Sequence, residues 1–252
     1  MSMKDRVAVV TGAGTGIGRA IAEGFAREGA KVVVNYSKSH EAADEVVAAI
    51  KAAGGTAIAI GADVSKQSEA KKLMEETVAK FGRLDYLINN AGWSTRIPHH
   101  QLDDLTDEIW DKTLNTNLRG AFYCARAAVP YLKKQKGAAI VNVASVAALM
   151  GQGSSLAYAA SKGGMVTMTK SLARALAPGI RVNAVLPGFV RTRFAGWTED
   201  AFAASEQITP LKRLATGEDI AEAAIFFAAH AAATTGETIV CDGGIAPLGP
   251  SV

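Results

Sequence analysis

The chain alternates continuous apolar runs with amphipathic stretches from one end to the other, and this rhythm constrains its fold more than any other feature. Apolar runs rich in Val and Ile predict strands at 6–11, 31–35, 57–61, 86–89, 138–144, 180–185 and 238–241. Because these runs are continuous, each strand should be covered on both faces, as in a parallel sheet. The sequence therefore predicts a seven-stranded parallel sheet.

Helical periodicity fills the intervals between the predicted strands. The helices are expected at 17–28, 41–53, 65–81, 104–134, 157–177 and 218–230. Right-handed crossovers of this kind give a doubly wound sheet with helices on both faces. No Pro/Gly/Ser-rich linker and no internal repeat divides the chain, so we expect a single α/β domain over residues 1–252.

Segment 189–212 interrupts this rhythm. It contains Gly196 and Pro210 together with the large aromatic residues Phe194, Trp197 and Phe202. An insertion after the carboxyl end of a strand often forms a lid, and we expect a small helical lid here. The alternative is a surface helical hairpin with an apolar underside.

Composition excludes several classes of protein. The net charge is only +3 and no Lys/Arg block is present, so a nucleic-acid surface is not expected. The apolar stretch 220–233 contains Glu222 and His230, which favours a packed helix over a membrane span. The chain starts without an apolar signal core, Cys124 and Cys241 have no metal-like spacing, and the histidines are scattered. We expect a cytoplasmic protein with free thiols and without a metal site.

A serine, a tyrosine and a lysine form the candidate catalytic group. Tyr158 and Lys162 are four residues apart, so on a helix they share a face. A neighbouring ammonium group is expected to lower the pKa of the phenol from its ordinary value near ~10, which would make it a usable general acid or base. Ser145 lies thirteen residues before the tyrosine and could donate to the same carbonyl oxygen. The pair alone is weak evidence, because such spacing usually marks a solvated helix face.

The first predicted strand ends in a glycine-rich turn from Thr11 to Gly18, which leads into a helix. Glycines at such a place let backbone N–H groups approach a pyrophosphate. The spacing is Thr-Gly-x-x-x-Gly-x-Gly, and dinucleotide binding is the predicted role. Asn90, Ser145 and Pro187 follow other strands at the same carboxyl edge, where ligands bind in open α/β sheets.

Further motifs follow in order along the chain: Asp63-Val64, Asn89-Asn90-Ala91-Gly92, Asn117-Leu118-Arg119-Gly120, Pro187-Gly188 with Thr192, and Asp242-Gly243-Gly244. With these motifs the chain resembles the short-chain dehydrogenase/reductase family over its whole length. Within the subfamily of about 250 residues it is similar to 3-oxoacyl-carrier-protein reductases and to glucose-dehydrogenase-like members. The resemblance implies a Rossmann-type fold and hydride transfer between a nicotinamide cofactor and a C=O or CH–OH group.

The resemblance also implies site residues. Tyr158 would protonate the carbonyl oxygen, Ser145 would place it, Lys162 would hold the nicotinamide ribose, and Asn117 would hold a relay water. The implied cofactor-binding residues are Gly12, Thr15, Gly16, Ile17, Gly18, Asn35, Tyr36, Ser37, Lys38, Asp63, Val64, Asn90, Ala91, Gly92, Tyr158, Lys162, Pro187, Gly188, Val190 and Thr192. Structural alternatives stay open for two of these polar residues, since Asp63 would also cap the next helix and Asn117 would also serve as a hydrogen-bond bridge. Ser154, Ser155 and Ser161 are interpreted as structural.

The end of the second predicted strand bears on the choice of nicotinamide. An NAD site usually has an acidic residue there, and this chain has none before Glu41. Ser37 and Lys38, with Asn35 beside them, could instead meet a 2′-phosphate. NADP(H) is therefore favoured and NAD(H) stays possible, because the arginine that the family pattern often places around Thr15 is missing.

The substrate side is apolar. Its candidate residues beside Ser145 and Tyr158 are Trp93, Val146, Leu149, Gln152, Phe189, Phe194 and Trp197. Such a pocket predicts a hydrophobic ketone or secondary alcohol as substrate, and hence a carbonyl reductase or alcohol dehydrogenase.

Three alternatives stay open. The first is an NAD-dependent sugar or alcohol dehydrogenase. The second is a 3-oxoacyl-carrier-protein reductase; here Ala177-Pro178-Gly179 lacks the basic residue expected before the glycine, although Lys136 is present. The third, a non-catalytic dinucleotide-binding regulator, is disfavoured because such proteins normally lose the tyrosine or the lysine. The resemblance further implies a homotetramer that pairs the helices at 104–134 and 157–177.

Overall fold

The computed structural model describes residues 2–249 and shows a seven-stranded parallel sheet with the order β3-β2-β1-β4-β5-β6-β7. The order reverses between β1 and β4, as in doubly wound folds, so the predicted sheet is confirmed. The strands are β1 (Val7–Val10), β2 (Lys31–Tyr36), β3 (Thr56–Gly61), β4 (Tyr86–Asn89), β5 (Ala139–Val143), β6 (Arg181–Pro187) and β7 (Thr238–Cys241).

The continuous apolar runs form the central strands for the reason expected from their composition. Every residue of β1, β4 and β5 is buried, with Val9 paired to Leu87 and Leu87 paired to Ile140 across the sheet. The edge strand β7 is only half-buried along its length. Two covered faces leave no solvent side for polar residues, which is why these strands show no alternation.

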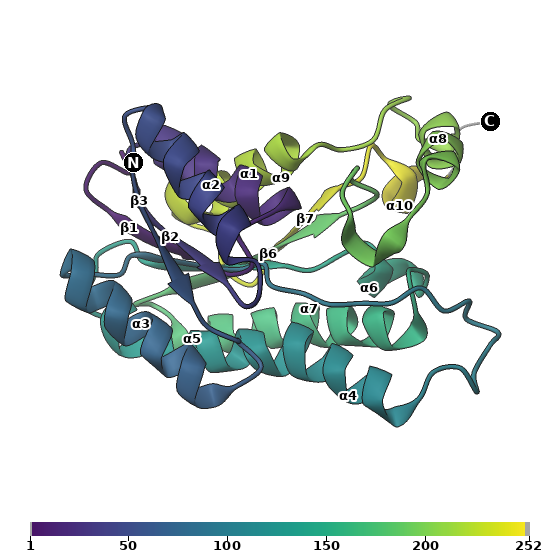
Figure 1. Ribbon diagram of the computed structural model, residues 1–252, viewed down its shortest axis with the longest axis horizontal. Helices are drawn as coiled ribbons and strands as arrows, with labels where there is room; N and C mark the ends of the chain where they lie inside the picture. The colour runs from purple at the N-terminus through teal and green to yellow at the C-terminus, as the bar shows by residue number, and fades with distance from the viewer. Residues whose placement is uncertain (1, 250–252) are drawn as a thin grey trace.

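Helices form a layer on each face of the sheet (Figure 1). One layer contains α1 (Gly16–Arg27), α2 (His40–Ala52) and α9 (Gly217–Ile225), and it packs on the core around Phe25 and Tyr86. The other contains α3 (Gln67–Phe81), α4 (Asp107–Leu114), α5 (Gly120–Leu132) and α7 (Leu156–Leu176). Its core is centred on residues such as Leu73 and Leu132.

The prediction of a single α-helix at 104–134 is wrong in one respect. Two α-helices, α4 and α5, are joined by a π-helical segment, η1 (Asn115–Arg119), which puts an extra residue into the turn at Asn117. A second π-helical segment, η3 (Phe226–His230), continues α9. Asn is a poor former of helix interiors, and π-helical turns occur frequently at functional sites.

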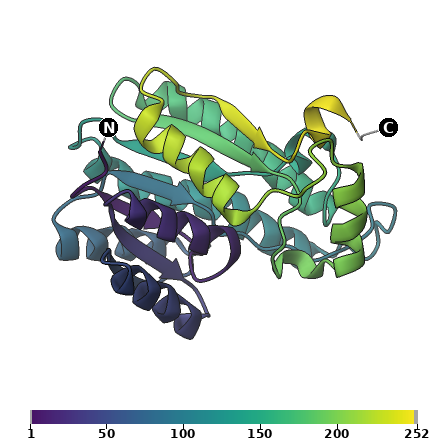
Figure 2. The same cartoon turned by 90° about the horizontal axis from the view of Figure 1, so that it is seen from above.

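The remaining short elements gather beyond one end of the sheet (Figures 1 and 2). They are α6 (Ala147–Met150), the 3₁₀ turn η2 (Phe194–Gly196), α8 (Glu199–Ile208) and α10 (Ile245–Leu248). The insertion at 189–212 is thus helical, and Arg191 forms ion pairs with Glu199 and Glu206 within it. Across residues 2–249, every helix is too short or too polar to cross a membrane.

Candidate active site

The glycine-rich turn lies directly against the segment that follows β4. A Cβ at Gly18 would lie 2.3 Å from the Gly12 carbonyl oxygen and 2.4 Å from the Asn90 amide nitrogen. Gly12 has φ +60°, and a Cβ there would lie 2.9 Å from the Cα of Ala91. The close approach of these two segments therefore requires glycine at both positions.

Thr11 ties the two segments together, and the sequence analysis did not assign it a role. Its hydroxyl oxygen accepts the backbone N–H groups of Asn90 and Ala91, both at 3.0 Å. The Asn90 amide returns hydrogen bonds to the carbonyls of Thr11 at 2.9 Å and Gly12 at 3.1 Å. The sequence does contain a signal for this role, because Thr11 is a hydroxyl-bearing residue between a buried strand and the first glycine of the turn.

The first turn of α1 presents backbone N–H groups at this edge. Thr15 precedes the helix without capping it through its side chain, and Thr15 and Gly16 are exposed. Thr192 approaches from the loop after β6, where its Cγ2 would lie 3.2 Å from a Cβ on Gly16. An uncapped helix N-terminus lined by glycine fits the pyrophosphate of a dinucleotide.

The Asn35 side chain, which was expected to help to meet a 2′-phosphate, forms its hydrogen bonds within the chain. It is buried, and its Oδ1 accepts the N–H of Gly12 at 3.3 Å. Its Nδ2 donates to the carbonyls of Ile60 and Ala62, each at 3.1 Å. Asn35 thus joins β2, β3 and the glycine-rich turn, because these inward-facing backbone groups need partners.

Beyond β2, the two residues expected to bind a phosphate form no side-chain hydrogen bond or ion pair within residues 2–249. Ser37 and Lys38 are exposed to solvent. The Tyr36 ring packs edge-on against His40, with 5.1 Å between the ring centroids, and it would lie 3.1 Å from a Cβ on Gly61. These side chains border the end of the glycine-rich turn, since a Cβ on Gly14 would lie 3.6 Å from the carbonyl oxygen of Ser39.

Two further residues from the cofactor set have structural partners. The Asp63 carboxylate accepts the Ser65 N–H at 3.0 Å and the Ser65 hydroxyl at 2.7 Å, so it closes the turn before α3. Val64 is buried and would lie 3.0 Å from a Cβ on Gly120, at the start of α5. The capping role considered for Asp63 is absent: the carboxylate stabilises the turn before the helix, and the N-cap residue of α3 is Lys66, which forms no side-chain cap.

Loop residues after β6 are held by the chain's C-terminal part. A Cβ on Gly188 would lie 2.6 Å from the Cβ of Asp242, so only glycine fits there. Val190 pairs with Ala215 through an isolated β-bridge, and the Pro187 carbonyl accepts the Val146 N–H at 3.0 Å. This packing places the loop beside the strand end that carries Ser145.

The side chain of Asn117 binds the loop after β4. Its Oδ1 accepts the Trp93 N–H at 2.7 Å, and its Nδ2 donates to the Trp93 carbonyl and to the Ser161 hydroxyl, both at 3.0 Å. Both amide N–H donors are used in these contacts. Asn117 is thus a hydrogen-bond bridge, the structural alternative considered for it, and a Cβ on Gly92 would lie 3.5 Å from its Oδ1 and 3.9 Å from Lys162 Nζ.

Ser145, Tyr158 and Lys162 meet where β5 ends and α7 begins. The Ser145 hydroxyl accepts the Ala147 N–H at 3.1 Å and forms a side-chain hydrogen bond with Tyr158. Lys162 donates to the Val143 carbonyl at 2.7 Å, and its Nζ lies 5.7 Å from the centroid of the Tyr158 ring. The i,i+4 spacing does place the ammonium group beside the phenol.

Serines around this group fix its position. Ser155 caps α7 by accepting the Tyr158 N–H at 3.2 Å, and Ser161 donates to the Tyr158 carbonyl at 2.7 Å. Ser155 stands three residues before the tyrosine, the spacing of a helix N-cap, which is the signal that identifies this role. The interpretation of Ser155 and Ser161 as structural is consistent with these bonds.

The electrostatics differ from the expectation that Lys162 lowers the pKa of the tyrosine. Burial raises the pKa of Tyr158 to about 12, and only the hydrogen bond with Ser145 acts in the opposite direction. Burial also lowers the pKa of Lys162 to about 8. The lysine donates to a backbone carbonyl and not to the phenol, so desolvation dominates and the free protein holds a protonated phenol.

Aromatic residues of the insertion cover this group. The rings of Phe194 and Tyr158 have centroids 5.7 Å apart, and Phe189 packs edge-on against Trp197 at 4.9 Å. Leu149 and Gln152 are exposed near α6. The insertion therefore lies as the expected lid would, over the tyrosine and beside the strand end.

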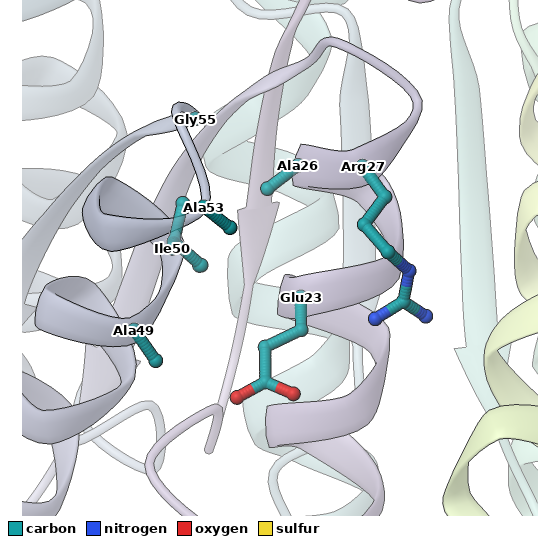
Figure 3. Close-up of a pocket in the computed structure, with 7 residues that line it drawn as sticks. All are labelled: Glu23, Ala26, Arg27, Ala49, Ile50, Ala53 and Gly55. Atoms are coloured by element: carbon teal, nitrogen blue, oxygen red, sulfur yellow. The ribbon is translucent and has the colours of Figure 1, made fainter.

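The hollow shown in Figure 3 lies elsewhere. It is a groove of about 240 Å³ between α1 and α2, lined by Glu23, Ala26, Arg27, Ala49, Ile50, Ala53 and Gly55. Because α1 starts at the carboxyl edge of the sheet and runs back, Arg27 at its end lies toward the opposite edge. Within residues 2–249, no group of three or more His, Cys, Asp or Glu side chains could hold a metal ion.

Comparison with known proteins agrees with this geometry. The family model described as enoyl-(acyl carrier protein) reductase matches residues 12–246. The chain is 42% identical over 246 residues to 3-oxoacyl-[acyl-carrier-protein] reductase from Synechocystis sp., with 95% of this chain and 96% of that protein covered. It is 40% identical over 245 residues to the reductase FabG from Staphylococcus epidermidis, covering 96% and 99%.

A solved structure matches as well. It is described as short-chain dehydrogenase/reductase SDR:glucose/ribitol dehydrogenase from Brucella melitensis, with a TM-score of 0.87, 36% identity, and coverage of 97% of this chain and 98% of that one. The likeness thus extends over sequence and fold together. The chain belongs to the short-chain dehydrogenase/reductase family and is an NAD(P)-dependent oxidoreductase that acts on CH–OH and C=O groups.

Proposed function

We propose that this protein is an NADP(H)-dependent carbonyl reductase that interconverts a hydrophobic ketone and its secondary alcohol. The observation that carries the proposal is the contact of Tyr158 with Ser145 on one side and with the ring of Phe194 on the other. A proton donor lies there beside a hydroxyl and under an aromatic cover, an arrangement suited to an apolar carbonyl compound.

In this proposal the protein's own groups place the carbonyl and move its proton. Ser145 accepts the Ala147 N–H, and its own hydrogen, which bonds to Tyr158 in this structure, would donate toward the carbonyl oxygen when substrate is bound. Tyr158, whose raised pKa keeps its hydroxyl protonated, transfers that proton to the oxygen as negative charge develops. The bound cofactor supplies the hydride.

Lys162 and Asn117 support this proton transfer, the first by its charge and the second by positioning. A cationic Lys162 beside the phenol would stabilise the phenolate that remains, and its ammonium is close to Gly92, where the nicotinamide end of the cofactor is expected. Asn117 positions Trp93 and the loop that contains Gly92. Its role in holding a relay water stays part of the proposal.

The preference for NADP(H) rests on the exposed end of β2. Lys38 and Ser37 are free to meet a 2′-phosphate, and no acidic side chain stands in the segment from Val34 to Ser39 to repel it. Asn35 contributes indirectly, by bracing the turn at Gly12. NAD(H) use stays the alternative, together with oxidation of a sugar or alcohol.

A 3-oxoacyl-carrier-protein reductase is the second candidate, because such proteins are among its relatives at about 40% identity. Lys136, the basic residue considered for carrier docking, lies just before β5, at the edge of the sheet opposite Ser145. Its backbone carbonyl accepts a hydrogen bond from Arg6. Within one chain this lysine is therefore separated from the tyrosine by the length of the sheet, which favours the carbonyl reductase.

A homotetramer is proposed with the helices α4, α5 and α7 at its contacts. Phe122 on α5 is exposed, and Gly163 on α7 faces open space, whereas Gly164 packs against Leu118 within the chain. On the small-residue face of α7, Gly164 therefore packs within the chain, and Gly163 leaves space for a contact with another subunit. Sedimentation of the purified protein measures the assembly directly.

The test of the proposed function is a fluorescence titration with NADPH and NADH, followed by turnover of small ketones and an acetoacetyl thioester. Tighter binding of NADPH and reduction of simple ketones support the proposal. Tyr158→Phe should bind NADPH normally and lose activity by a factor of about 100 or more. Preference for NADH with activity only on alcohols or sugars, or full activity of Tyr158→Phe, contradicts it.

A further inference from the structure

The loop that follows Trp93 is fastened to the segment that begins the tyrosine helix. The Ile97 N–H donates to the Ser154 carbonyl at 2.7 Å, and the hydroxyls of Ser94 and Ser154 lie 2.6 Å apart. Ser155, the next residue, caps the helix of Tyr158. The backbone of Arg96 lies between these two attachments, so its position relative to Tyr158 is fixed.

The Arg96 side chain lies against Trp197 in the insertion at 189–212. Its guanidinium carbon is 5.0 Å from the centre of the Trp197 ring, which packs against Phe189 at 4.9 Å. A guanidinium that lies over an aromatic ring still has N–H donors that point outward in the plane of the guanidinium itself. Arg96 is itself exposed, so those donors are open to solvent.

Within the described residues 2–249, no carboxylate neutralises this arginine. Among residues 2–249, none forms an ion pair with Arg96, whereas Arg191 in the same region pairs with both Glu199 and Glu206. Lys112, a second cation beside the site, lies 4.0 Å from the Trp93 ring centre and likewise has no ion-pair partner in the described part of the chain. A positioned guanidinium without an ion-pair partner in residues 2–249, held beside the aromatic ring of Trp197, is suited to a planar oxyanion.

We propose that Arg96 binds an oxyanion, a carboxylate or a phosphate, at the end of the substrate remote from its reacting carbonyl. This inference rests on the proposed function, because it places the ketone at Tyr158. The rings of Phe194, which packs against Tyr158, and of Trp197, which lies beside Arg96, would contact the apolar middle of the substrate. The preferred substrates are therefore ketones with an apolar chain and an anionic terminus.

The experiment compares kcat/KM for matched pairs of ketones that differ only in charge. Levulinate and longer straight-chain keto acids are each paired with their methyl esters, and the acetoacetyl thioester of phosphopantetheine is paired with that of pantetheine. The proteins are wild type, Arg96→Gln, Arg96→Lys and the control Arg27→Gln, which removes an exposed arginine from the groove in Figure 3.

Arg96→Gln should lose about tenfold in kcat/KM on the anionic member of a pair and retain its activity on the neutral member. On the anionic member, the kcat/KM of Arg96→Lys should lie between those of wild type and Arg96→Gln, because lysine keeps the charge without the planar fork. Arg27→Gln should match wild type. A response confined to the keto acids identifies a carboxylate, and a response confined to the thioesters identifies a phosphate; either supports the proposal.

Two results overturn it, and they differ from failure of the proposed function. If Arg96→Gln leaves every ratio of anionic to neutral substrate unchanged, or if Arg27→Gln lowers the ratios equally, Arg96 does not bind an oxyanion. In both cases the neutral ketones are still reduced, so the carbonyl reductase stands. If wild type reduces no ketone of either kind, the proposed function fails and the inference fails with it.

Discussion

The amide of Asn117 binds the backbone of Trp93 from both sides, accepting its N–H at 2.7 Å and donating to its carbonyl at 3.0 Å. The same amide donates to Ser161 on the helix of Tyr158 and Lys162. One buried side chain therefore joins η1, the loop after β4 and α7. The π-helical turn that contains Asn117 directs the amide inward between these two elements.

Replacing Asn117 with Ala should loosen all three elements at once. The Trp93 N–H and the Ser161 hydroxyl would lose buried partners, so the free energy of unfolding should fall by about 2–3 kcal/mol. Activity should fall further than stability explains, because the loop near Gly92 is no longer fixed. Urea unfolding and kcat are the measurements.

The matched control is Asn115→Ala in the same π-helical segment, since the Asn115 side chain forms no hydrogen bond within residues 2–249. Its stability should stay within about 0.5 kcal/mol of wild type. Equal losses in the two variants would show that the segment, and not the bridge, is responsible.

The sheet was predictable because each strand carries its own signal. β1, β4 and β5 are short apolar runs, and burial on both faces follows from their composition alone. The glycine-rich turn was predictable for a similar reason, since it lies between a strand and a helix that are adjacent in sequence. Local patterns were sufficient wherever the determining neighbours lie close in the chain.

Residues with distant partners were less predictable. Asn117 meets partners 24 and 44 residues away, so neither its π-helical turn nor its bridge follows from the sequence around it. Asn35 donates to carbonyls 25 and 27 residues further along, so its bracing role does not follow from the sequence around it. The pKa of Tyr158 depends on the burial of its surroundings, which the spacing to Lys162 does not reveal.

Gly18→Ala should disrupt the cofactor cradle. The new methyl group would lie 2.3 Å from the Gly12 carbonyl oxygen, so the turn and Asn90 must separate. We expect a loss of about 1–3 kcal/mol in the free energy of unfolding and a large rise in the Kd for NADPH. Gly179→Ala is the control, because Gly179 is exposed, a Cβ there would meet only the Leu176 carbonyl oxygen at 3.7 Å, and the free energy of unfolding should stay within about 0.5 kcal/mol of wild type. Unchanged NADPH binding in Gly18→Ala would argue against this cradle.

Lys162 should give the stability a specific pH dependence. Its pKa is lowered by burial from the ordinary 10.5 to about 8, so between these values the unfolded chain binds more protons than the folded one. Stability therefore rises with pH in this window, and wild type should gain up to about 3 kcal/mol relative to Lys162→Met. Below pH 8 both states carry the charge and the difference between the two proteins is constant.

This dependence is measured by urea unfolding of both proteins from about pH 7 to 10. Tyr158, whose pKa of about 12 lies above its ordinary value of 10.0, lowers stability only above pH 10. A difference between wild type and Lys162→Met that stays flat, or that falls as pH rises, would mean that the ammonium is not desolvated in the free protein.

Lys38→Ala should separate the two nicotinamide cofactors. Removing an exposed cation at the end of β2 takes away a charge-assisted contact with a 2′-phosphate and leaves a 2′-hydroxyl unaffected. The Kd for NADPH should rise about tenfold while that for NADH stays constant. Lys51→Ala, at the far end of α2, is the control that should change neither. An equal rise in the Kd for NADPH and for NADH would show that Lys38 does not contact the 2′-phosphate.

Phe194→Ala should weaken the hold on hydrophobic ketones without unfolding the protein. The Phe194 ring packs against Tyr158 but is 37% exposed, so its loss leaves most of the core intact. An aromatic contact of this kind corresponds to about a two- to tenfold change in kcat/KM, expressed mainly in KM. Leu211→Ala is the control, since Leu211 lies on the same insertion and is 66% exposed. If both variants raise KM equally, the insertion as a whole shields the site; if neither does, Phe194 contacts the tyrosine only in the absence of substrate, because the lid has moved.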